Sequence, residues 1–147
     1  MFTNNFDKYY TPEYLDIYCI QKFNQTFPDC THIIEPSAGN GAFSKCLDNC
    51  IAYDIKPESD EIIECDFLKL EIPYRKYRGI LGNPPFGING ELAIRFLNKS
   101  ILIADFIGFI LPIFLVSFKI GNKIPFNFVS SLDIGKHCFK WFSTLLF

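Results

Sequence analysis

The chain has 147 residues, enough for one domain of ordinary size and too few for two. Hydrophobic residues make up 49% and charged residues 20%, so a sizeable core is expected and global disorder is excluded. The net charge of −2 excludes a protein that binds nucleic acid through its overall charge alone.

The first predicted elements surround a glycine-containing loop. Thr11 and Pro12 predict the start of a helix, with the threonine hydroxyl as N-cap and proline at the first helical position, and this helix ends near Asn24. Residues 31–41, THIIEPSAGNG, predict a strand that leads into the loop. After the loop, apolar side chains at the spacing of one helix face predict a second helix. These side chains are Phe43, Cys46, Leu47 and Cys50.

Short strands then recur along the chain. Three are expected over residues 50–54, 61–67 and 78–83. Apolar residues at helical spacing between Ala93 and Ile101 predict a further helix, and residues 105–111 predict a fifth strand. Short apolar strands that alternate with helices predict an α/β fold, a parallel doubly wound sheet covered on both faces.

The segment 100–118, SILIADFIGFILPIFLVSF, is the most apolar in the chain. It contains Asp105 and Pro112, and the apolar stretch from Phe106 to Phe118 is shorter than the ~20 residues that span a bilayer. We interpret it as a helix end followed by a buried central strand, and we expect no membrane partner.

The six cysteines, at positions 19, 30, 46, 50, 65 and 138, form no Cys-x-x-Cys pair. Structural zinc needs four ligands at close spacing, so we expect no metal. The N-terminal MFTNNFDKYY lacks the apolar stretch of a cleaved signal. We expect reduced thiols in an intracellular protein, cytoplasmic or associated with the nucleoid or nucleus.

Polar side chains follow four of the predicted strands. They are Glu35, Asp54, Asp66 and Asn83. Parallel doubly wound sheets bind ligands at the carboxyl ends of their strands, so these side chains predict a binding site at that edge.

The composition of the loop EPSAGNGAF (35–43) favours a role in cofactor binding. Gly39 and Gly41 allow a tight turn and a close approach of a ligand to the backbone, and Asp54 would accept hydrogen bonds from ribose hydroxyls. The dinucleotide fingerprint needs glycine or alanine where Ser44 stands, so a nucleoside-like cofactor is favoured over NAD. A tight strand-to-helix turn without a ligand remains the alternative.

The tetrapeptide NPPF (83–86) suits chemistry on an amino group conjugated to a ring. The Asn83 side-chain oxygen and the carbonyl of the next residue would accept both amino hydrogens and favour a tetrahedral nitrogen. Pro84 and Pro85 would hold these acceptors rigid, and Phe86 would stack on the ring. A simple turn is the alternative.

EPSAGNGAF, AYD, CDF and NPPFG in this order, preceded by KYYTPEYL, resemble the S-adenosylmethionine-dependent amino-methyltransferases, especially the adenine-specific DNA methyltransferases. The resemblance covers roughly residues 8–113. It implies a class I, Rossmann-like methyltransferase fold. It also implies that S-adenosyl-L-methionine is the cofactor and that a flipped adenine is the target.

The resemblance assigns roles to individual residues. Those implied at the methionine moiety are Tyr10, Thr11, Pro12, Glu35, Pro36, Ser37, Ala38 and Gly39, with Gly41 completing the loop. Asp54 and Ile55 would line the ribose, and Asp66 and Phe67 the adenine ring. Asn83, Pro84 and Phe86 would hold the target amino group, with Pro85 as support and Asn83 also beside the cofactor.

We therefore expect one methyltransferase domain over 1–147, with a cofactor-contacting helix over 8–25, a core over 31–116 and a remainder over 117–147. The family carries a further hairpin and a target-recognition domain after the fifth strand. The remainder has room for two short strands and not for a recognition domain, which leaves open a sheet truncated at its C-terminal strands. Its apolar end, from Trp141 to Phe147, suits a sixth strand, a partner interface or the remnant of a shortened gene.

The expected activity is site-specific transfer of a methyl group to the 6-amino group of adenine in DNA. RNA adenine, the 2-amino group of guanine and protein glutamine are alternatives, because each presents a planar conjugated nitrogen. A non-catalytic cofactor-binding subunit whose partner supplies target recognition, or an inactive gene product, are alternatives of another class.

Overall fold

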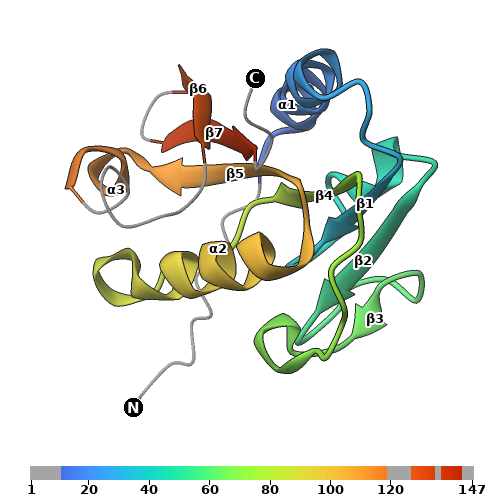
Figure 1. Cartoon of the computed structure of the whole chain (residues 1–147). Helices are drawn as coiled ribbons and strands as arrows, with labels where there is room; N and C mark the ends of the chain where they lie inside the picture. The colour runs from blue at the N-terminus through green and yellow to red at the C-terminus, as the bar shows by residue number, and fades with distance from the viewer. Residues whose placement is uncertain (1–10, 119–126, 135–136, 144–147) are drawn as a thin grey trace.

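The computed structural model describes residues 11–118, 127–134 and 137–143. Its centre is a seven-stranded sheet with the order β3-β2-β1-β4-β5-β7-β6 (Figure 1). The strands are β1 (His32–Glu35), β2 (Cys50–Asp54), β3 (Ile63–Glu64), β4 (Arg78–Gly82), β5 (Phe106–Pro112), β6 (Asn127–Asp133) and β7 (His137–Ser143). The first five pair in parallel, and β7 pairs antiparallel to both β5 and β6.

Helix α1 (Glu13–Thr26) covers one face of this sheet. Its inner side chains, among them Phe23, pack against Ile33 of β1 and Leu81 of β4. The ring of Phe27, just past the helix, stacks on Phe106 of β5 with centroids 4.7 Å apart. This cluster fixes the helix across three neighbouring strands.

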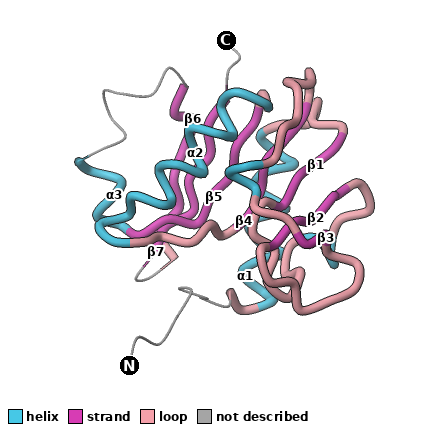
Figure 2. The backbone as a smooth tube through the Cα atoms, turned by 90° about the horizontal axis from the view of Figure 1, so that it is seen from below, coloured by secondary structure: helices cyan, strands magenta, loops and turns pink. Residues whose placement is uncertain are grey.

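Helix α2 (Glu91–Ile103) covers the opposite face and runs alongside β4 and β5 (Figure 2). There Phe96 and Leu97 pack against Ile34 of β1 and Ile80 of β4. Each of these two residues is adjacent in its strand to a residue that packs against α1. Successive side chains of a strand point to opposite faces, so strands of continuous apolar sequence fill both cores. The predicted doubly wound sheet is confirmed.

The connection from β1 to β2 differs from the prediction. Where the apolar spacing predicted a helix, the structure has turns and the single 3₁₀ turn η1 (Ser44–Cys46), and Cys50 already belongs to β2. Figure 2 shows that the part of the chain around β1, β2 and β3 is mostly loop. The prediction of a helix there is wrong.

Two further boundaries were predicted inaccurately. Pro12, and not Thr11, is the N-cap residue of α1, and no side chain caps the helix. The third strand was expected over 61–67, whereas β3 contains only Ile63 and Glu64, at the edge of the sheet. Strands β2, β4 and β5 begin and end within one residue of their predicted bounds.

The strands β6 and β7, of seven residues each, extend the sheet beyond β5. The sheet is therefore not truncated at its C-terminal strands: the remainder forms two strands, for which the sequence left room, and Trp141 and Phe142 belong to β7. Phe147 lies outside the described residues.

The segment 100–118 forms the end of α2, the fully buried strand β5 and the short helix α3 (Ile113–Phe118), as predicted for its helix end and strand. Within the described ranges, no helix combines the length and the apolar character that crossing a bilayer requires. The five cysteines whose side chains are described, at positions 19, 30, 46, 50 and 65, are free thiols.

Candidate active site

Four polar residues lie at consecutive strand ends of the parallel sheet. In the order of the strands they are Asp66 after β3, Asp54 at the end of β2, Glu35 at the end of β1 and Asn83 after β4. The carboxyl ends of parallel strands meet at one edge, so the sheet topology brings these side chains to the same side of the molecule.

The backbone of the loop after β1 is hydrogen-bonded to β2 and folds into a tight turn. The N–H of Ala38 donates to the carbonyl of Tyr53 at 2.8 Å, and the N–H of Gly41 closes a turn onto Ala38 at 2.7 Å. Gly39 and Gly41 have φ values of +58° and +82°, in the region that favours glycine. A Cβ added at Gly39 would meet no atom within 4 Å, so a ligand has room to approach the backbone at this position.

Glu35 is 2% exposed and holds the far side of this loop. Its carboxylate accepts hydrogen bonds from the backbone N–H of Ser44 at 2.8 Å and of Phe43 at 3.4 Å. Burial raises the pKa of Glu35 to about 7, against the lowering effect of these hydrogen bonds. The residue expected at the methionine moiety thus also organises the turn that replaces the predicted helix.

Asp54 is 7% exposed and joins two loops at the end of β2. One oxygen accepts from the N–H of Gly39 at 2.8 Å and the other from the N–H of Lys56 at 2.8 Å. A carboxylate oxygen has two lone-pair directions, so each oxygen keeps one acceptor site for a ligand hydroxyl. The next side chain, Ile55, is 52% exposed and offers an apolar surface beside it.

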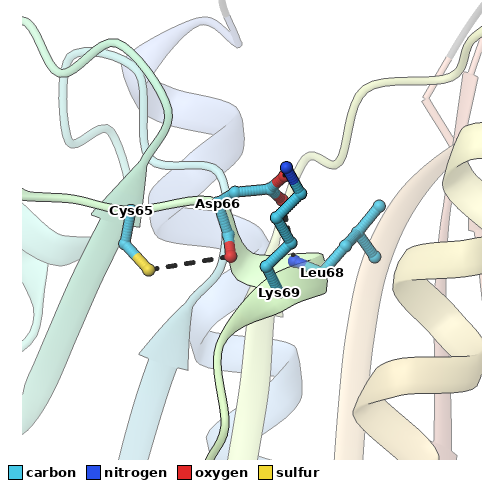
Figure 3. Close-up of polar contacts among 4 residues, drawn as sticks. All are labelled: Cys65, Asp66, Leu68 and Lys69. Atoms are coloured by element: carbon cyan, nitrogen blue, oxygen red, sulfur yellow. Dashed lines mark hydrogen bonds and ion pairs between the residues drawn. The ribbon is translucent and has the colours of Figure 1, made fainter.

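Asp66 begins the 3₁₀ turn η2 (Phe67–Lys69), shown in Figure 3. It accepts from the N–H of Leu68 at 3.0 Å, and its other oxygen lies 4.0 Å from the Nζ of Lys69. Phe67 is 1% exposed and stacks on Phe96 in the core, with centroids 5.4 Å apart. Its ring is therefore packed in the core, and the expectation that Phe67 lines an adenine stays a prediction that its backbone alone could fulfil.

The NPPF segment leaves β4 and leads directly into α2. The carbonyl of Phe86 accepts from the N–H of Leu92 at 3.1 Å and of Ala93 at 3.3 Å, which anchors the segment to the first turn of the helix. Pro84 is buried, whereas Pro85 and Phe86 are partly exposed. The Phe86 ring lies 5.3 Å from the imidazole of His137 at the start of β7.

Asn83 connects the NPPF segment to the two other parts of the site. The hydroxyl of Ser37 donates to its backbone carbonyl at 3.1 Å, and its side-chain Nδ2 donates to Thr11 Oγ1 at 3.2 Å. The glycine loop, the residues before α1 and the NPPF segment therefore meet at one residue. Pro12 is exposed beside Thr11, and Tyr10 lies outside the described residues.

Two residues of this region were missed from the sequence. His137 comes from a strand that sequence patterns did not delimit, so nothing pointed to it. Asp16 lies on the inner face of α1 and is 1% exposed. Its signal was present, because Asp16 shares the helical spacing of the buried Cys19, Ile20 and Phe23.

No metal site is evident in the part of the chain that the structure describes, where no three His, Cys, Asp or Glu side chains come together.

The sequence itself matches no family model and no curated protein. Its fold, however, matches 27 chains of solved structures. PH1948 from Pyrococcus horikoshii, described as a candidate RNA methyltransferase, is 15% identical with a TM-score of 0.71, over 96% of this chain and 89% of its own. The 23S rRNA methyltransferase ErmE is 11% identical with a TM-score of 0.66, over 92% of this chain and 69% of its own.

A third structure, the candidate methylase HI0767 from Haemophilus influenzae, is 14% identical with a TM-score of 0.60, over 91% of this chain and 99% of its own. Likeness at such identities establishes the fold and not the activity. The chain has the class I, Rossmann-like methyltransferase fold that the resemblance implied.

Proposed function

We propose that this chain transfers a methyl group from S-adenosylmethionine to the exocyclic 6-amino group of adenine in nucleic acid, with DNA as the target that its sequence motifs favour. One observation carries the proposal: Asn83 of the NPPF segment is hydrogen-bonded to both Ser37 of the glycine loop and Thr11 before α1. The residues expected to hold the target amine and those expected to hold the cofactor thus form one connected site.

The residues present fit a nucleoside-containing cofactor. The open approach at Gly39 suits a ligand lying against the loop, Asp54 keeps acceptor sites for ribose hydroxyls, and Ile55 offers an apolar contact. When bound, S-adenosylmethionine supplies an electrophilic methyl group on a positively charged sulfur. Asp66, whose side chain is 31% exposed at this edge, suits a cationic ligand.

The residues of this chain would make the target amino nitrogen a better nucleophile. The carboxamide oxygen of Asn83 and the carbonyl of Pro84 accept the two amino hydrogens, which draws the lone pair out of conjugation with the ring. Two prolines and the anchored carbonyl of Phe86 keep these acceptors fixed. As the bond from nitrogen to the methyl carbon forms, the bond from that carbon to sulfur would break and the thioether would leave. The methylated nitrogen is strongly acidic and would release its proton to water without a dedicated base.

Calorimetry with S-adenosylmethionine tests the cofactor half of the proposal. Asp54→Ala removes the acceptors for ribose and releases the N–H of Gly39, so we expect affinity to fall by about 1.5–3 kcal/mol, the strength of a charge-assisted hydrogen bond. Asp48→Ala is the matched control, because it removes an exposed acid just before the opposite end of β2.

Unchanged affinity in Asp54→Ala, with the control also unchanged, would remove Asp54 from the site. A folded wild type that binds no S-adenosylmethionine would overturn the cofactor assignment itself.

RNA is the second candidate target. Two of the structural neighbours are named for RNA or rRNA methylation, which favours it. To distinguish DNA from RNA as the target, the chain is incubated with a DNA and an RNA oligonucleotide of the same sequence, each with an unpaired adenine. The 6-methyladenine formed in each is measured by mass spectrometry. Methylation of the RNA alone would replace DNA by RNA in the proposal.

A further inference from the structure

The loop that leads into β4 presents four exposed side chains in a row. They are Tyr74, Arg75, Lys76 and Tyr77, and we call residues 74–77 the YRKY loop. The rings of Tyr74 and Tyr77 are 54% and 36% exposed. Because the loop precedes β4, it lies at the edge of the sheet where the parallel strands begin, opposite to the candidate active site.

A buried acid fixes both ends of the YRKY loop. Asp105, which directly precedes β5 and is 4% exposed, accepts from the hydroxyl of Tyr74 at 2.9 Å and from the N–H of Tyr77 at 2.6 Å. Hydrogen bonds to a carboxylate are among the stronger ones in proteins. The two tyrosines are thus held in place from below, although their rings are exposed.

The end of α2 holds the middle of the loop. The carbonyl of Ile103 accepts from the N–H of Arg75 at 3.3 Å and from Nη1 of Arg78 at 3.1 Å. The same Nη1 donates to the carbonyl of Pro73 at 2.7 Å. The buried guanidinium of Arg78 therefore organises the backbone from which the exposed side chains project.

Tyr77 has an unfavourable backbone conformation. Its φ is +64°, in the left-handed region that glycine adopts without cost and that a bulky residue rarely adopts. An exposed ring adds little to the packing of the core, so packing does not account for a tyrosine at this position. Strain of this kind points to a role for the side chain at the surface.

The loop is also locally basic. Arg75, Lys76 and Arg78 fall within four positions, and residues 72–80 contain no acid. The pKa of His32, at the start of the neighbouring β1, is lowered by its burial and further by the charges of Arg75 and Arg78. An anion is therefore favoured at this surface, although the whole chain is weakly acidic.

Exposed cations beside exposed aromatic rings suit an unpaired nucleic-acid strand. The Nζ of Lys76 lies 4.7 Å from the centre of the Tyr77 ring, so a cation and a ring are presented together. Cations bind the phosphates of a single strand, and its unpaired bases stack on aromatic side chains. An acidic peptide would match the cations and leave the rings without a specific partner.

We propose that the YRKY loop is a second contact surface for the strand that the chain methylates, with Arg75 and Lys76 at phosphates and the tyrosine rings against bases. The inference rests on the proposed function for the identity of the strand. The five residues of β4 separate the loop from the NPPF segment by about 16 Å, at about 3.3 Å per residue. A strand must therefore extend several nucleotides beyond the target adenine to reach both.

Binding is measured without cofactor, by fluorescence anisotropy of a labelled single strand of about sixteen nucleotides, as DNA and as RNA, over a series of salt concentrations. We expect the double variant Arg75→Gln, Lys76→Gln to bind about tenfold more weakly at low salt. The slope of log affinity against log salt should become shallower by about 1.4, because each phosphate contact with a single strand contributes about 0.7.

The matched control removes two cations elsewhere. Lys22 of α1 also lies over a tyrosine ring, 5.4 Å from the centre of Tyr18, and Arg95 is exposed on α2. Lys22→Gln, Arg95→Gln gives the same net charge as the loop variant and should leave the slope unchanged. Equal losses in the two double variants, or a folded wild type that binds neither strand, would overturn the inference.

Tyr77→Gly tests the ring separately from the charge. Glycine adopts the backbone conformation of this position freely, so the urea midpoint should not fall, whereas affinity for the strand should fall about tenfold through lost stacking. Wild-type affinity in this variant would contradict the contact between the ring and a base.

Kinetics separate this inference from the proposed function. The loop variant should raise KM for the long strand and leave kcat unchanged, because the loop lies away from the reacting atoms. With a trinucleotide as substrate, the loop variant and wild type should be equal, and a raised KM there would contradict the second contact. A wild type that binds the strand and transfers no methyl group would defeat the proposed function, while the binding series would still decide the role of the loop.

Discussion

Asp54 illustrates how one side chain can organise the candidate site and keep acceptors for a ligand. Its two oxygens accept from the N–H groups of Gly39 and Lys56 at 2.8 Å each, and under the proposed function the remaining lone pairs accept from ribose hydroxyls. Glu35 does the same on the other side of the loop through Ser44 and Phe43. Substitution of either acid will therefore disturb loop geometry as well as affinity.

The buried acids Asp16 and Glu35 predict an unusual dependence of stability on pH. Burial is the largest cause that raises the pKa of each to about 7, from ordinary values of 3.8 and 4.5. Between those ordinary values and pH 7 the folded chain binds more protons than the unfolded chain. The free energy of unfolding should therefore fall as pH rises from 5 to 8, by on the order of 2–4 kcal/mol.

Urea unfolding at pH 5, 6, 7 and 8 measures this slope. Asp16→Asn removes one of the two contributing groups and should flatten the dependence, whereas Asp48→Asn, at an exposed position, should not. A free energy of unfolding that rises over this range would show that neither carboxyl is held protonated by the fold.

At the scale of residues, the sequence predicted some members of the candidate site and missed others. Glu35, Asp54, Asp66 and Asn83 could be placed at strand ends because short apolar strands end visibly where a polar residue begins. Asp16 was missed because a helix pattern is judged by its apolar members.

Among the elements, the connection between β1 and β2 explains the main error in the predicted fold. Phe43 and Leu47 are spaced as on a helix, yet both reach the core from turns. Glu35 takes the backbone N–H groups of Phe43 and Ser44, and the extended backbone of Leu47, with φ −130° and ψ 127°, ends the 3₁₀ turn after three residues. Spacing alone cannot separate a helix from a packed loop when a side chain from another element supplies the hydrogen bonds.

Helix α1 packs so closely against Gly79 of β4 that a larger residue at this position would clash. A Cβ added at Gly79 of β4 would lie 2.9 Å from Cζ of Phe23 and 2.7 Å from Sγ of Cys30. We expect Gly79→Ala to lower the free energy of unfolding by about 1–3 kcal/mol, the usual cost of overpacking.

Phe23→Leu removes the ring atoms that Gly79→Ala would strike, so the double variant should lose less stability than the sum of the two single variants. Chemical denaturation of the four proteins gives this coupling energy. Strict additivity would mean that α1 and β4 accommodate the extra methyl group by some other movement.

At the scale of the whole molecule, the sequence was most informative about the sheet. The parallel half follows from strands that are apolar on both faces, and the buried residues of β1, β4 and β5 contribute to the clusters on both sides of the sheet. The antiparallel β6–β7 pair could not be delimited, because β6 carries exposed Phe128 and Val129 beside polar residues and shows no clear alternation.

The net charge of the chain predicts a preference for single-stranded over duplex substrate. With a net charge of −2, contacts to phosphate should be weak, and flipping a base from duplex DNA costs a few kcal/mol that such contacts cannot offset. We expect this chain alone to methylate an unpaired adenine in a single strand far faster than the same adenine in a duplex. A methylation assay on the two forms of one oligonucleotide measures the ratio, and efficient, sequence-specific methylation of the duplex would contradict it.

The central claim is that Asn83 acts on the target amine at the transition state of methyl transfer. The most direct test measures 6-methyladenine by mass spectrometry in oligonucleotides incubated with S-adenosylmethionine and either wild type or Asn83→Ala, alongside the cofactor affinity of both. The account predicts that Asn83→Ala abolishes transfer while binding the cofactor nearly as tightly as wild type. Continued transfer by a folded Asn83→Ala variant would contradict it and place the chemistry elsewhere in the molecule.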